Sequence, residues 1–122
     1  MTPFGARLRE LRQARGVTLS DMAREIGVSP TYLSALEHGR RGRPSWALVQ
    51  QVIQYFNVIW DDAEELQRLA NMSHPRVVID TAGLSPSATR LANRLAHRIR
   101  ALSERDLAAI LALLEGPESG EA

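Results

Sequence analysis

The sequence predicts an all-α protein with five helices and a two-helix C-terminal extension. Apolar residues recur every three or four positions in most segments, which is the spacing of one helix face. Ser or Thr residues suited to helix N-caps precede these segments, and Gly residues follow several of them. With 122 residues, 44% of them hydrophobic and 24% charged, the chain has the composition of one globular domain with an appendage.

The first two helices are predicted on either side of Gly16. The first begins near Phe4 and ends at Gly16, which is a natural C-terminal stop. Thr18 and Asp21 have the spacing of a capping box, so a short second helix is expected from there to Gly27. Gly27 suits a tight turn that requires a positive φ angle, because glycine has no Cβ atom to clash with the backbone.

The third helix is predicted to begin at Ser29-Pro30, where an N-cap residue is followed by proline at the first helical position. It is expected to stop at Gly39. The next five residues, RRGRP (40–44), contain Gly and Pro as helix breakers, so they are predicted to form an arginine-rich loop.

The fourth and fifth helices are predicted to complete the first domain. Ser45 can cap the fourth helix. Asp61 with Glu64 can start the fifth, which is expected to end near Met72. These elements place a helical domain over residues 1–72.

Residues 73–85 are predicted to be a linker. It includes a short extended segment, RVVID (76–80), because β-branched residues favour an extended backbone. Ser85-Pro86 then repeats the N-cap and proline signal, and a sixth helix is expected to run from there to about Leu102.

The last predicted helix begins at Ser103 with Asp106, again in the form of a capping box, and ends at Gly116. A helical hairpin over residues 86–116 and a disordered tail over 117–122 are therefore expected. The two helices have more apolar surface than they can bury against each other, so they must pack on the first domain or on a second copy of the chain. We favour dimerisation, with an intramolecular extension of the core as the alternative.

One side of the sixth predicted helix carries Arg90, Arg94 and Arg98. Their spacing places all three on the same face. This stripe is expected to be a solvated face. The alternative interpretation is a DNA contact, additional to the one argued below for the third helix.

The net charge of +1 hides an uneven distribution along the chain. Residues 1–46 contain eight Arg and four acidic residues, whereas residues 47–122 contain seven Arg and ten acidic residues. A basic N-terminal block of this kind attracts polyanions.

Several classes of protein are excluded by what the sequence lacks. There is no Cys, no Gly-rich phosphate loop and no pattern of paired catalytic carboxylates, so we expect neither an enzyme nor a cofactor. His74 and His97 are isolated, and no metal site is expected. The longest apolar run, 107–114, is too short to span a membrane, and the N-terminus lacks the apolar core of a signal peptide, so a cytoplasmic protein is predicted.

The second and third predicted helices would share a small core and leave the outer face of the third helix polar. Such a face beside an arginine loop suits insertion into a DNA groove. The residues expected to contact DNA are Thr31, Tyr32, Ser34, His38, Arg40, Arg41 and Arg43. Tyr32 has the alternative role of covering the helix surface, and His38 that of capping the helix C-terminus.

The stretch VTLSDMAREIGVSPTYLSALEHGRRGRPS (17–45) resembles the helix-turn-helix family of phage repressors, Cro proteins and their bacterial relatives of the xenobiotic-response-element (XRE) type. The resemblance extends over about residues 5–60. It implies a five-helix domain like that of lambda repressor, whose third helix enters the major groove. It also implies a buried ion pair between Arg12 and Glu37, which suits these residues because a buried acid needs a partner and Arg offers a bidentate one.

The sequence also departs from this family. Many relatives have Gln in the first turn of the second helix, where this chain has Leu19, and the phage repressors begin the recognition helix with Gln, where this chain has Pro30-Thr31. Ala35 replaces another polar residue that reads bases. Base recognition is therefore expected to shift to Thr31, Tyr32 and Ser34.

Together, these features predict a sequence-specific DNA-binding transcription regulator, most simply a repressor, that binds a palindromic operator in double-stranded DNA as a homodimer. The first alternative is the antitoxin of a toxin–antitoxin operon, which would add a protein partner. The second is a helical protein–protein adaptor that has lost DNA binding.

Overall fold

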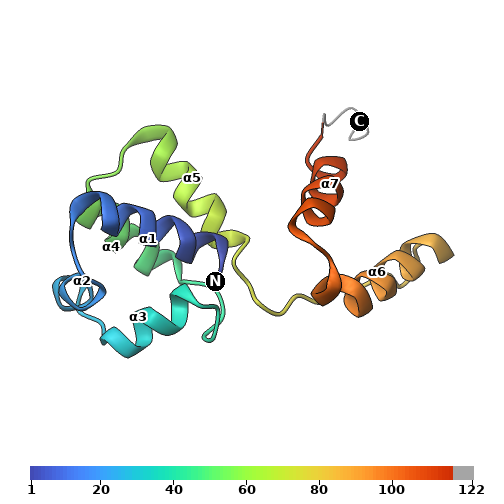
Figure 1. Ribbon diagram of the computed structural model, residues 1–122, viewed down its shortest axis with the longest axis horizontal. Coiled ribbons are helices and arrows are strands. Elements are labelled where there is room, and N and C mark those ends of the chain that lie inside the picture. The colour runs from blue at the N-terminus through green and yellow to red at the C-terminus, as the bar shows by residue number, and fades with distance from the viewer. Residues whose placement is uncertain (117–122) are drawn as a thin grey trace. The chain divides into compact units, whose positions relative to one another are not determined.

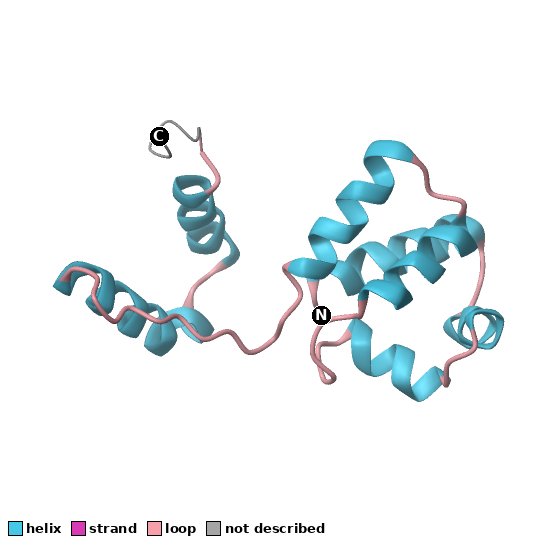
Figure 2. Cartoon of the chain, turned by 180° about the vertical axis from the view of Figure 1, so that it is seen from behind, coloured by secondary structure: helices cyan, strands magenta, loops and turns pink. Residues whose placement is uncertain are grey.

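The computed structural model describes residues 1–116, and in this range the chain forms helices joined by loops, with no strand (Figure 1, Figure 2). The prediction of an all-α fold is confirmed. The chain divides into two units, one over Met1–Val77 and one from Val78 onward. The predicted tail, 117–122, lies outside the described residues.

The N-terminal unit contains five helices. They are α1 (Pro3–Arg15), α2 (Leu19–Ile26), α3 (Pro30–Glu37), α4 (Trp46–Phe56) and α5 (Trp60–Asn71). In this unit α1 packs against α3 and α5, α2 packs against α3 and α4, and α4 packs against α5 (Figure 1).

Hydroxyl side chains cap four of these helices, which explains where the helices begin. Thr2, Thr18, Ser29 and Ser45 each accept a hydrogen bond from a backbone N–H three residues later, at 2.9–3.1 Å. At Thr18 only this half of the predicted capping box forms. The Asp21 carboxylate instead accepts a hydrogen bond from Arg24 at 3.0 Å.

The prediction for the start of α5 is wrong by two residues, because the N-cap position is Ile59 and not Asp61. The helix begins at Trp60 after Ile59, which has no side-chain capping bond, and Asp61 lies inside the first turn. An acidic residue in a first turn is stabilised by the partial positive charge of the helix N-terminus, so Asp61 favours this helix end without capping it.

The core of the N-terminal unit is a single cluster of buried apolar side chains contributed by all five helices. It comprises Phe4, Leu8, Met22, Ala23, Ile26, Leu33, Leu36, Leu48, Val49, Val52, Phe56, Leu66 and Ala70. The cluster holds α2 and α3 on the other helices through one face only, so the opposite face of α3 is left for other contacts.

The backbones of α1 and of the end of α3 approach each other closely. A Cβ atom at Gly5 would overlap the backbone carbonyl group of Glu37. The same carbonyl oxygen accepts a hydrogen bond from the Thr2 N–H at 3.1 Å. Because glycine has no Cβ atom, it allows the two backbones to meet at this point.

The C-terminal unit contains α6 (Pro86–Arg98), a short 3-10 helix η1 (Ile99–Ala101) and α7 (Glu104–Leu114). The sixth predicted helix therefore changes to 3-10 geometry before Leu102. Ser103 and Asp106 form both hydrogen bonds of the predicted capping box.

None of the residues from 78 to 116 is buried, so the two long helices of the C-terminal unit do not bury a core between them. The exposed apolar side chains of this unit include Leu91, Ile99, Leu111, Leu113 and Leu114. Arg90, Arg94 and Arg98 are exposed as well. The predicted extended segment, 76–80, has no regular secondary structure. Among the helices of residues 1–116, none is long and apolar enough to cross a membrane.

Candidate nucleic-acid interface

The α2–turn–α3 segment is held together by its core side and by its turn. Gly27 adopts the predicted positive φ angle, 83°, and both Gly27 and Val28 donate their N–H groups to the Ala23 carbonyl at 2.9 Å. Gln51 of α4 donates to the carbonyl of Ile26 at 3.2 Å. These hydrogen bonds provide partners for backbone carbonyl groups at the end of α2 and hold the turn that leads into α3.

The outer face of α3 borders an open depression of about 520 Å³. Four of the predicted DNA-contacting residues line it: Thr31 and Ser34 from α3, and Arg40 and Arg41 from the loop that follows. The remaining lining residues are Pro30 and Ala35. The structure thus brings hydroxyl groups and guanidinium groups together around one concave surface.

Tyr32 does not line this depression. Its ring is half-buried and packs against the core of the N-terminal unit. The Arg41 guanidinium carbon lies 6.0 Å from the centre of the Tyr32 ring, which is the outer limit of a cation–π contact. The Tyr32 ring thus packs against the core and lies near the Arg41 guanidinium group.

His38 and Arg43 are not among the residues that line the depression. Both are exposed. The Nδ1 atom of His38 lies 2.9 Å from the Ser34 carbonyl oxygen, so with its proton on Nδ1 the ring donates a hydrogen bond to the C-terminal turn of α3. This geometry leaves Nε2 for a contact outside the helix.

The three arginines of the loop carry charge that the described part of the chain does not neutralise. Arg40, Arg41 and Arg43 are exposed, and within residues 1–116 none of them lies within 4.0 Å of a carboxylate oxygen. Unpaired guanidinium groups beside a concave polar surface suit phosphate groups, which Arg can bind through two parallel hydrogen bonds.

Glu37, at the end of α3, is fully buried and is held by α1. Arg12 donates from Nε to Oε2 at 3.1 Å and from Nη2 to Oε1 at 3.3 Å. Arg9 adds a weaker contact, with Nη2 4.0 Å from Oε1. The bidentate pair connects α1 to α3 and so sets the position of the outer face of α3.

The fold and this surface define a helix-turn-helix module whose second helix faces outward. The family described as helix-turn-helix domain matches residues 3–69, and the chain belongs to that family. The resemblance to XRE-type helix-turn-helix regulators is thereby confirmed.

Curated relatives match the same region. The chain is 37% identical over 62 residues to the uncharacterized HTH-type transcriptional regulator RghRB of Bacillus subtilis, which covers 51% of this chain and 45% of that protein. It is 33% identical over 61 residues to the HTH-type transcriptional repressor RghR of the same organism, covering 50% and 45%. It is 42% identical over 59 residues to the HTH-type transcriptional regulator DdrOP3 of Deinococcus deserti, covering 48% and 45%.

The matched region is about half of this chain and slightly less than half of each relative. These relatives are named as regulators or repressors of transcription. No solved structure matches the chain significantly.

Two residues beside the arginine loop were not predicted from the sequence. His74 and Arg76 follow α5, yet they line a cavity together with Arg40 of the loop. No local pattern could have indicated this, because more than 30 positions separate the two segments and only the packing of α5 brings them together.

Proposed function

We propose that this chain is a sequence-specific DNA-binding regulator of transcription, most simply a repressor, whose helix α3 enters the major groove. The observation that carries the proposal is the concave surface beside α3, which is lined by hydroxyl groups of the helix and by exposed arginines of the loop that follows it. The similarity to relatives that are named as regulators or repressors of transcription supports a role in transcription.

The side chains divide into base-reading and phosphate-binding groups by their chemistry. Thr31 and Ser34 offer hydroxyl groups that both donate and accept, which suits base edges in the major groove. Tyr32, which does not line this surface, adds one phenol group that can both donate and accept a hydrogen bond. Pro30 and Ala35 have no side-chain donor, so their part of the surface can make only apolar contacts, such as with a thymine methyl group.

The remaining predicted residues suit the DNA backbone. Arg40, Arg41 and Arg43 would bind phosphates on the strand that borders the groove, and His38 would donate from Nε2 to another phosphate. Contacts of this kind set the register of a protein on DNA without reading its sequence. The carboxylate of Glu37 does not repel the DNA phosphates, because Arg12 neutralises its charge inside the protein.

We propose further that the protein binds as a homodimer through residues 78–116. Leu91 of α6 and Leu114 of α7 are 65% and 68% exposed, and helices of 13 and 11 residues without a buried face are marginal in water. A second copy of the same unit would bury these faces. A two-fold dimer would then require a palindromic operator, with half-sites about one helical turn or a multiple of it apart.

The proposal is tested by selecting bound sites from a random library of duplex DNA with the full chain. We expect a palindromic consensus. Thr31→Ala should relax the preference at one position in each half-site, because one base contact contributes about 1–3 kcal/mol of discrimination. Gln13→Ala, at an exposed polar position on α1, is the control and should select the wild-type consensus.

Recovery of no enriched sequence by the wild-type chain would contradict the proposal. A consensus that Thr31→Ala leaves unchanged would remove Thr31 from the base-reading residues. A consensus without two-fold symmetry would contradict the homodimer.

A further inference from the structure

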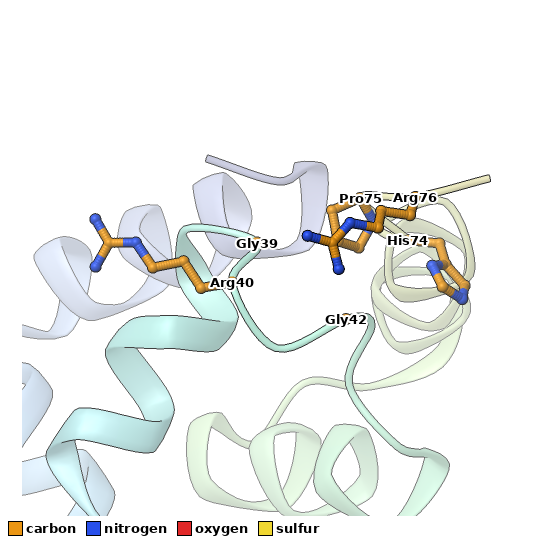
Figure 3. Close-up of a pocket in the computed structure, with 6 residues that line it drawn as sticks. All are labelled: Gly39, Arg40, Gly42, His74, Pro75 and Arg76. Atoms are coloured by element: carbon orange, nitrogen blue, oxygen red, sulfur yellow. The ribbon is translucent and has the colours of Figure 1, made fainter.

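A second cationic cavity lies next to the surface described above. It has a volume of about 380 Å³ and is lined by Gly39, Arg40 and Gly42 of the loop after α3, and by His74, Pro75 and Arg76 of the segment after α5 (Figure 3). Arg40 also lines the depression on α3. The two concave surfaces are therefore neighbours that share one arginine.

Figure 3 shows how the two arginines are arranged around the loop. The side chain of Arg76 extends toward the part of the loop that carries Gly39 and Gly42, whereas that of Arg40 extends from the opposite side of Gly39. The guanidinium groups thus flank the loop from two sides. A phosphate chain passing over the loop would meet a cation on each side.

The segment after α5 is held in this place by a buried anchor. The hydroxyl of Ser73 is an acceptor for the Phe4 N–H at 2.9 Å and donates to the Leu69 carbonyl at 2.6 Å. Ser73 is 2% exposed. On the loop side, a Cβ atom at Gly39 would lie 3.6 Å from the Cβ of Pro75, so the two segments are nearly in contact. The position of His74 and Arg76 is set by packing.

The electrostatics of this cavity favour an anion. Its side chains include two arginines and one histidine, and no acidic residue lines it. Within residues 1–116, Arg76 and Arg40 have no carboxylate oxygen within 4.0 Å. His74 and Arg76 are both exposed, so a ligand can reach them.

We infer that Arg76 binds a backbone phosphate of the DNA duplex, next to the phosphates bound by the arginine loop. This inference rests on the proposed function. A DNA backbone is favoured over a free anion because the cavity adjoins the α3 surface through Arg40, and a duplex carries one negative charge per about 1.7 Å of its axis. The DNA contact then extends from the helix-turn-helix segment to the residues that follow α5.

The test measures binding of the full chain to a random-sequence duplex by fluorescence anisotropy across a salt series, because a phosphate contact does not depend on sequence. Arg76→Gln should reduce the magnitude of the slope of log K against log salt by about 0.9. Equivalently, between about 50 and 200 mM salt the wild type should lose about 3.5-fold more affinity than Arg76→Gln. Arg76→Lys should keep the wild-type slope.

Arg68→Gln is the matched control. It removes the same charge from α5, where Arg68 is exposed and paired with Glu65, and it should keep the wild-type slope. The same slope in Arg76→Gln and wild type would overturn the inference and leave the proposed function intact. A wild-type chain without salt-dependent binding would overturn both.

A second measurement separates DNA from a free anion. The NMR signal of the Arg76 side chain is followed during titration with inorganic phosphate and, separately, with the duplex. We expect a saturable shift with the duplex alone. A saturable shift with phosphate at millimolar concentration, and none with the duplex, would contradict the inference and indicate a site for a free anion.

Discussion

The helices before and after Val78 have similar amphipathic patterns but differ completely in burial. Leu33 of α3 is fully buried, whereas Leu91 of α6 is 65% exposed. Both are leucines on the apolar face of a short helix that begins with Ser-Pro. The comparison shows that an apolar helix face predicts packing against another apolar surface. Whether that surface belongs to the same chain depends on the other helices around it.

The two units also differ in how their charges are used. In the N-terminal unit a buried carboxylate, Glu37, is neutralised by Arg12 and connects two helices. In the C-terminal unit Arg90, Arg94 and Arg98 are all exposed on α6. Substitutions of buried residues in the N-terminal unit should therefore affect folding. Substitutions of exposed apolar residues in the C-terminal unit should affect the proposed assembly.

The largest expected effect on stability comes from breaking the buried ion pair. Arg12→Ala leaves the Glu37 carboxylate buried without its main partner, which should lower the free energy of unfolding by about 3–5 kcal/mol. Urea denaturation followed by circular dichroism measures this loss. Arg7→Ala, which removes an exposed pair with Glu10, is the control and should cost at most about 1 kcal/mol. Equal losses in the two variants would show that the pair does not stabilise the fold.

The next largest effect on stability is expected where α1 and α3 approach each other closely. Gly5→Ala places a methyl group against the Glu37 carbonyl, so the helices must separate, at a cost of about 1–3 kcal/mol or more. The midpoint of thermal unfolding reports this cost. Ala6→Ser adds one atom at the neighbouring exposed position and should change stability by less than about 0.5 kcal/mol. A Gly5→Ala protein as stable as Ala6→Ser would show that the two backbones can move apart freely.

The smallest effect on stability, with a large effect on assembly, is expected in the C-terminal unit. Leu111→Asp should leave the unfolding of the N-terminal unit within about 0.5 kcal/mol of wild type, because Leu111 is 49% exposed in the single chain. It should convert the proposed dimer to a monomer, because a charge would be buried between the copies.

Sedimentation at micromolar concentration measures this assembly. Trp60→Asp is the control: Trp60 is 82% exposed in the N-terminal unit, and its replacement should leave the dimer intact. A monomeric wild type, or a Leu111→Asp variant that remains dimeric, would contradict dimerisation through residues 78–116.

Much of the fold could be predicted because its signals are local. The caps at Thr18, Ser29 and Ser45 act over three residues, and the left-handed turn at Gly27 depends on one residue. The apolar face of each helix follows from a repeat of three or four positions. These interactions form between neighbours in the chain, so the chain order reveals them.

The pairing of Arg12 with Glu37 was implied by the family resemblance, since no local pattern connects residues 25 positions apart. The surface around α3 was predicted in part: Thr31 and Ser34 follow from helix periodicity, whereas the position of Tyr32 against the core does not. The burial of this ring depends on how α3 packs on the core, and that core is built by all five helices together.

The sequence by itself determined the order of the helices, most of their N-terminal caps, the tight turn between α2 and α3 and the polar outer face of α3, because backbone hydrogen bonds and side-chain spacing act locally. Tertiary structure alone decided that Arg40 and Arg41 join Thr31 and Ser34 around one concave surface, and that His74 and Arg76 lie beside the same loop. The position of His74 and Arg76 depends on the packing of α5 on α1 and on the buried hydroxyl of Ser73. These contacts bring segments together that are distant in the chain.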